Sequence, residues 1–126
     1  MGFKIFMLVI LLLTPAIMIG FGLAFRRAAP REINPLFGYR TSRSMKNRQT
    51  WEFAHRLIGK LWIRCGVLAL LAGLVPMLIF ITRDKDFIGD LGCILLYAQL
   101  ALMILPIPGV ERALRRSFDE NGDPKA

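Results

Sequence analysis

Three long apolar runs, separated by charged segments, set the hydrophobic pattern of the chain. Each run has 18 to 21 residues without Asp, Glu, Lys or Arg, and the runs cover residues 5–25, 65–82 and 91–110. A helix of about 20 apolar residues crosses the roughly 30 Å hydrocarbon core of a bilayer. Because uninterrupted runs of this length satisfy their backbone groups in lipid as helices, the pattern predicts an all-α membrane protein. We expect three transmembrane helices, at about residues 4–25, 61–82 and 89–110.

A signal peptide is the alternative for the first run. The apolar region of a signal peptide is usually about 7–15 residues long and is followed by a small-x-small cleavage site. Here the run is longer, and Arg26 and Arg27 follow it directly. We therefore expect a retained span and a single three-helix membrane domain over residues 1–126.

The segment between the first two spans, residues 26–60, divides into two halves. Residues 30–47 are rich in Pro, Gly, Asn, Ser and Thr, which is typical of a loop with turns. From Arg48 onward the apolar residues recur at helical spacing, at Trp51, Ala54, Leu57, Ile58, Leu61 and Trp62. We expect an amphipathic cytoplasmic helix with its tryptophans at the headgroup level. It should lie along the inner leaflet or lead into the second span.

The basic residues give the spans a direction. Of the 17 Lys and Arg residues, ten lie in residues 26–64 and four in the tail 111–126, whereas the N-terminus has one and the hairpin 83–90 has two. The positive-inside rule therefore predicts an external N-terminus and a cytoplasmic C-terminus. The net charge of +8 then suits anionic headgroups, and we expect no direct nucleic-acid partner. The polar end of the tail is expected to be disordered.

Few residues could support catalysis or metal binding. One His and two Cys are too few for a tetrahedral zinc site, and no Ser or carboxylate completes a triad with His55. Cys65 and Cys93 fall at opposite ends of their spans, so no disulfide is expected. Gln99 lies within the third span, where we expect it to form hydrogen bonds between helices. Pro76, Pro106 and Pro108 should kink their helices. We expect no enzyme activity, cofactor or metal.

The loop contains a recognisable pair of motifs. NPLFGYRT at residues 34–41, followed by Trp51, His55-Arg56 and Gly59-Lys60, resembles the SdpI family of bacterial membrane proteins. Members of that family have an N-x-x-F-G-Y-R-T signature after one span, then a W-x-x-x-H-R-x-x-G-K helix that runs into the next. The match covers about residues 34–66 and departs from the family at Ser42, where Pro is common. The candidate recognition residues are Asn34, Phe37, Gly38, Tyr39, Arg40, Thr41, Trp51, His55, Arg56, Gly59 and Lys60.

The resemblance implies a non-catalytic protein of the bacterial plasma membrane. The named member of the family is larger, protects against a secreted peptide toxin and holds a transcriptional repressor at the membrane. The resemblance thus implies a peptide toxin and a cytoplasmic repressor as partners. A subunit of an oligomeric small transporter or channel is the alternative function, and homo-oligomerisation stays open.

Two motif residues have competing interpretations. Arg40 is either a cation held by its turn to bind an anionic group, or a juxtamembrane arginine that serves orientation and surface charge. His55 is either a switch that titrates near neutral pH or an interfacial residue that forms hydrogen bonds.

Overall fold

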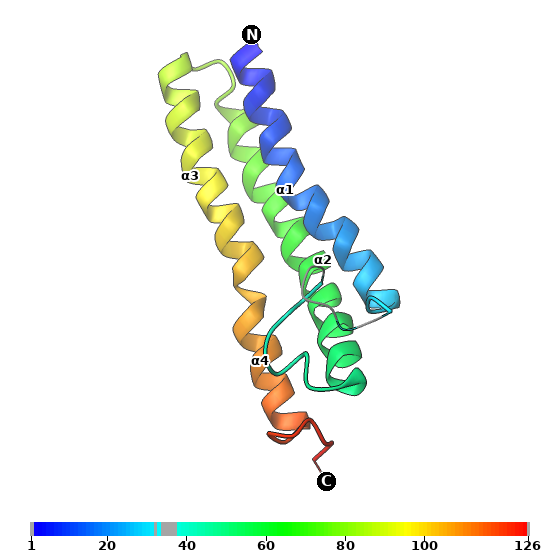
Figure 1. Ribbon diagram of the computed structural model, residues 1–126. Helices are drawn as coiled ribbons and strands as arrows, with labels where there is room; N and C mark the ends of the chain where they lie inside the picture. The colour runs from blue at the N-terminus through cyan, green and yellow to red at the C-terminus, as the bar shows by residue number, and fades with distance from the viewer. Residues whose placement is uncertain (1, 32, 34–37, 126) are drawn as a thin grey trace.

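Three long helices pack side by side in the computed structural model, which describes residues 2–31, 33 and 38–125. The elements are α1 (Gly2–Arg27), α2 (Arg48–Ile79), α3 (Lys85–Ile104) and α4 (Pro106–Ser117). The short connection between α2 and α3 makes these helices antiparallel neighbours, and α4 extends α3 beyond a break (Figure 1). The two ends of the chain therefore lie at opposite ends of the bundle.

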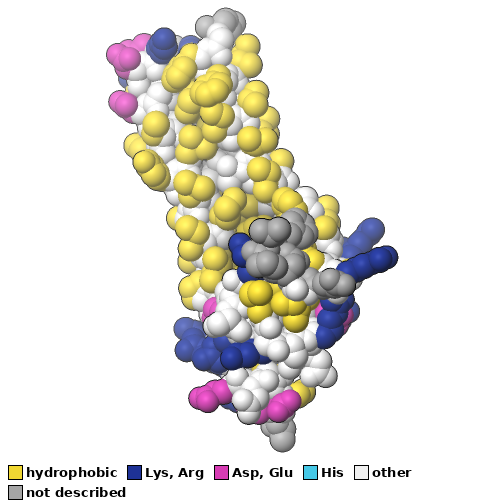
Figure 2. Space-filling model, viewed as in Figure 1, with side chains coloured by type: hydrophobic (Ala, Val, Ile, Leu, Met, Phe, Trp, Pro, Cys, Tyr) yellow, Lys and Arg dark blue, Asp and Glu magenta, His cyan; other side chains and the backbone are white. Residues whose placement is uncertain are grey.

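Most large apolar side chains in the middle of the bundle face outward. Residues of this kind are exposed along α1, α2 and α3, including Phe6, Leu71, Ile79, Ile94 and Ile104. Figure 2 shows apolar atoms along the length of the helices and charged side chains at the two ends. Three helices are long and apolar enough to cross a membrane. An exposed apolar belt of this extent is what lipid, rather than water, would cover.

The predicted amphipathic segment and the second span form one continuous helix. α2 begins at Arg48, the residue at which helical periodicity begins in the sequence. Asn47 is the N-cap: its side chain accepts a hydrogen bond from the Thr50 amide at 2.9 Å, and the Thr50 hydroxyl accepts one from the Asn47 amide at 3.0 Å. This reciprocal pair satisfies two backbone donors that a helix start leaves open.

The prolines act differently at different places. Pro15 and Pro76 lie inside α1 and α2, which continue through them. Pro106 is the first residue of α4, and Leu105 separates α4 from α3. Because proline lacks an amide donor and its ring clashes with the preceding turn, the third predicted span is divided here. The third predicted span thus consists of two consecutive helices that meet at Leu105, and Pro108 lies in the first turn of the second one.

Gln99 joins all three long helices at the centre of the bundle. Its side-chain amide is fully buried and donates hydrogen bonds to the carbonyl oxygens of Leu11 and Ala69, each at 2.9 Å. The expected role of Gln99 as an interhelical hydrogen-bonding residue is therefore confirmed. A Cβ atom on Gly73 would collide with the Gln99 amide nitrogen, so the absence of a side chain there makes room for the amide.

This arrangement predicts that Gly73→Ala has opposite effects on stability in the unmodified chain and in a Gln99→Ala background. Gly73→Ala should lower the free energy of unfolding by about 1–3 kcal/mol, because the new methyl group overfills the space of the Gln99 amide. In a Gln99→Ala background the collision is removed, and the same change should be neutral or stabilising since alanine favours helix. Unfolding in mixed detergent micelles measures both.

Gly20→Ala is the matched control, because its new Cβ meets no atom within 4 Å. If Gly73→Ala costs the same stability with and without Gln99, the amide does not occupy the position described.

Candidate functional site

The motif residues gather where the loop crosses the first turns of α2. We call Gly38, Tyr39, Arg40, Thr41, Trp51, His55, Arg56, Gly59 and Lys60 the motif cluster. Asn34 and Phe37, the two remaining candidate residues, lie outside the described residues. The cluster lies at the end of the bundle that carries Arg26 and Arg27 of α1.

His55 connects the loop to α2 through both nitrogens of its ring. It is fully buried; Nε2 accepts a hydrogen bond from the Tyr39 amide, and Nδ1 lies 2.8 Å from the Trp51 carbonyl oxygen. A nitrogen that accepts an amide hydrogen carries no proton, so the ring is neutral with its proton on Nδ1. The hydrogen-bonding interpretation of His55 therefore matches this geometry.

Gly38 lets the loop reach this histidine. Its φ angle is +105°, a conformation that other residues rarely adopt. A Cβ atom there would lie 2.6 Å from His55 Nε2 and 3.2 Å from Pro30 Cγ. Both the backbone angle and the close approach therefore require glycine, and they place the Tyr39 amide against the ring.

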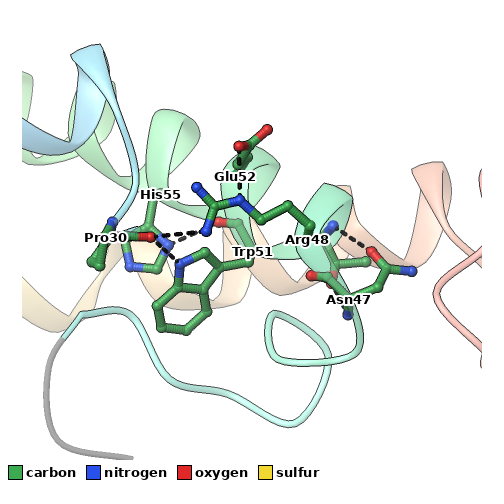
Figure 3. Close-up of polar contacts among 7 residues, drawn as sticks. Pro30, Asn47, Arg48, Trp51, Glu52 and His55 are labelled. Carbon is green, nitrogen blue, oxygen red and sulfur yellow. Dashed lines mark hydrogen bonds and ion pairs between the residues drawn. The ribbon is translucent and has the colours of Figure 1, made fainter. Parts of the chain in front are cut away.

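Trp51 is an internal residue and not a headgroup anchor. Its side chain is fully buried, its Nε1 donates to the Pro30 carbonyl oxygen at 2.9 Å, and its ring lies 4.3 Å from the His55 ring (Figure 3). Arg48 also donates to the Pro30 carbonyl, at 3.3 Å, and pairs with Glu52. The expectation that Trp51 anchors the helix by contact with headgroups is wrong, because the loop folds back over the start of α2 and covers the indole.

Tyr39 connects the loop to α4 through a hydrogen bond. Its hydroxyl donates to a carboxylate oxygen of Glu111 at 2.7 Å. Burial, and then the hydrogen bond to Glu111, raise the pKa of the Tyr39 phenol above its ordinary value, so the hydroxyl stays a donor at physiological pH. Sequence reasoning did not single out Glu111, whose place directly before the basic residues of the tail was its only signal.

A hydroxyl network holds the residues that follow Arg40. Ser44 is fully buried, accepts a hydrogen bond from the Thr41 amide at 2.9 Å and lies 3.0 Å from the Tyr39 carbonyl oxygen, to which it donates. The Thr50 hydroxyl lies 3.0 Å from the Ser44 carbonyl oxygen. The network therefore fixes the backbone on the C-terminal side of Arg40, whereas the His55 contact fixes it on the N-terminal side.

The comparison with protein families agrees with this architecture. The SdpI/YfhL protein family matches residues 31–109, which include the loop, α2 and α3. The chain belongs to the SdpI/YfhL family. Comparisons with curated proteins and with solved structures gave no match.

In this SdpI/YfhL chain, Gly59 of the motif is a helix-packing residue. A Cβ atom at Gly59 would lie 2.5 Å from the Arg26 amide nitrogen and 2.7 Å from the Gly22 carbonyl oxygen. A Cβ atom at Gly22 would likewise lie 2.8 Å from the Gly59 carbonyl oxygen of α2. Small residues of this kind let two backbones approach in a membrane, which brings the end of α1 against the motif cluster.

The cluster separates into buried and exposed parts. Gly59, Trp51 and His55 are buried, whereas Arg40, Arg56 and Lys60 are exposed. Within the part of the chain that the structure describes, no group of three or more His, Cys, Asp or Glu side chains could hold a metal ion. The site thus presents cations on a fixed backbone.

The tail also differs from expectation. Phe118 forms an isolated bridge with Pro124, and the Asn47 side chain donates to the Gly122 carbonyl oxygen at 2.6 Å. Gly122 is buried with φ of +84°. The predicted disorder of the tail is therefore wrong up to Lys125: its polar residues form a turn that packs beside the N-cap of α2.

Gly38→Ala should open the loop. The substitution forces an unfavourable φ angle and a clash with His55, at a cost of about 1–3 kcal/mol. Local opening should then expose residues 38–47 to trypsin, with cleavage about tenfold faster or more. The measurement is the rate of trypsin cleavage in detergent at a fixed protein concentration.

Gly109→Ala is the comparison variant, since its Cβ would meet nothing within 4 Å. Equal cleavage rates for the two variants would mean that glycine at position 38 is not needed to hold the loop against His55.

Proposed function

We propose that this SdpI/YfhL family member is a non-catalytic protein of the bacterial plasma membrane. It protects the cell against a membrane-active peptide toxin, or relays the presence of the toxin to a cytoplasmic regulator. The observation that carries the proposal is the motif cluster, in which buried residues hold the loop and three cations stay exposed. An acidic partner, such as an acidic helix of a regulator, would meet these cations at defined positions.

The electrostatic setting supports contact on the basic side of the membrane. Arg40, Arg56 and Lys60 lie at the end of the bundle where residues 26–64 and the tail together hold fourteen of the 17 basic residues. Charge of one sign steers an oppositely charged partner and accelerates its association. The cytoplasmic side is proposed for this end, in agreement with the positive-inside rule.

This orientation gives a direct test. A reporter that is active only in the cytoplasm should give signal when fused after Lys125, and a reporter active only outside should give signal when inserted in residues 83–90. The reason is the large excess of Lys and Arg in the loop and tail. Signal from the outside-only reporter at the tail would reverse the proposed orientation and remove the cytoplasmic regulator from consideration.

The role of the exposed cations is tested with Arg40→Ala. Bacterial cells that express the chain should resist depolarisation by a panel of membrane-active bacterial peptides, measured with a voltage-sensitive dye. Arg40→Ala should remove most of this protection at equal protein level, because the fixed loop positions that cation for recognition. Insertion should be unchanged, because it depends on the apolar helices and the total basic excess.

Arg112→Ala is the matched control, since it removes an equally exposed arginine of α4 at the same end. Equal small losses for the two variants would mean that bulk positive charge alone matters. Trp51→Ala is unsuitable for this purpose: Trp51 is buried, and its loss would disturb the fold itself.

A further inference from the structure

A groove of about 400 Å³ opens between the helices next to the motif cluster. Its volume falls within the range of small-ligand pockets, roughly 300–1,000 Å³. Apolar side chains from all four helices line it, among them Ile17, Phe21, Ile58, Trp62, Met103 and Ile107. The groove is therefore a shared feature of the bundle and not a gap between two helices.

The polar end of the groove is made by the loop. Gly38, Tyr39, Arg40 and Thr41 contribute to its lining, and Arg40 carries the only charge among the described lining residues. Glu111, which accepts the hydrogen bond from Tyr39, is not among the described lining residues. Among the described lining residues, Arg40 is therefore the group that can bind an anion.

The groove extends from the basic end into the apolar belt. Along α1 its wall runs from Phe25, beside the His55 ring, to Ile17. Eight residues of helix correspond to about 12 Å. Ile17 and Phe21 are 43% and 39% exposed, so this wall is open to the surrounding lipid. One end of the groove thus lies at the charged boundary of the bundle and the other within the span.

We propose that the groove binds one anionic phospholipid of the surrounding bilayer. One acyl chain lies between α1, α2 and α3, and the phosphate group contacts the Arg40 guanidinium. The apolar walls match a hydrocarbon chain, and a guanidinium forms charge-assisted hydrogen bonds with phosphate. The polar end of the groove lies at the charged boundary and its apolar end lies within the span. A phospholipid has its headgroup and its acyl chains in the same order along the bilayer normal.

A peptide segment suits the groove less well. A peptide backbone in an apolar environment needs a partner for every amide and carbonyl group. The groove offers few: the Tyr39 hydroxyl is bound to Glu111, and the Thr41 hydroxyl accepts the Ser44 amide at 3.2 Å. An acyl chain has no such requirement, and lipid surrounds the open wall.

Tryptophan fluorescence tests this site directly. Trp62 lines the groove, whereas Trp51 is buried beneath the loop. The full chain is placed in vesicles of unlabelled phosphatidylcholine that contain a fixed fraction of one brominated lipid. This lipid is either phosphatidylglycerol or phosphatidylcholine, and its brominated acyl chains quench nearby tryptophan. Trp62→Phe identifies the part of the quenching that reports on the groove.

We expect brominated phosphatidylglycerol to compete for the groove about fivefold better than brominated phosphatidylcholine, the factor that one well-placed arginine supplies. Arg40→Ala should bring the preference close to one, and Arg112→Ala should leave it intact. Ile17→Phe, which narrows the apolar end without a change of charge, should lower the Trp62-dependent quenching by both brominated lipids.

Equal quenching by the two lipids in the unmodified chain would overturn the proposal, as would equal loss in Arg40→Ala and Arg112→Ala. Trp62-dependent quenching that falls in Arg40→Ala but is untouched by Ile17→Phe would place only a headgroup at the mouth. The groove would then be left to another occupant such as a peptide, and the proposal would also be overturned. The vesicles contain no toxin, so failure here removes the lipid site and leaves the proposal of protection to its own test.

Discussion

The neutral imidazole of His55 is the contact on which the basic end of the molecule depends. One ring nitrogen receives the Tyr39 amide from the loop, and the other faces the Trp51 carbonyl one turn earlier in α2. A protonated ring would have two donors, and the Tyr39 amide would then have no acceptor. Because an unpaired buried amide costs about 1–3 kcal/mol, the fold of the loop and the protonation state of the ring are coupled.

The other features of the loop follow from this contact. Gly38 is needed because any side chain would occupy the space of the His55 ring. Trp51 is internal because the loop that binds His55 also passes over the indole. The Pro30 carbonyl oxygen of this loop accepts the hydrogen bond from the indole nitrogen. Tyr39 then points toward α4, where its hydroxyl reaches Glu111. Segments 72 residues apart in sequence are thereby joined by a single side chain.

The sequence predicts the long-range layout well and the packing of the loop poorly, for a physical reason. Apolar length identifies the spans, and the step from turn-forming to helical residues identifies the start of α2 at Arg48, where the Asn47 and Thr50 pair adds a local signal. The position of Trp51 depends instead on whether a distant segment covers it. Helical periodicity places the indole on the apolar face but does not distinguish lipid from protein as its neighbour.

The loop holds Arg40 in place without burying it. The Tyr39 amide is fixed on one side and the Thr41–Ser44 turn on the other, so the backbone at Arg40 is set before any ligand arrives. A ligand would therefore not have to order the loop backbone, which costs far more than ordering one side chain. A cation on a free segment would provide the same charge and bind more weakly. The buried residues of the motif therefore determine where the exposed cation lies, and this is how they would contribute to the proposed recognition.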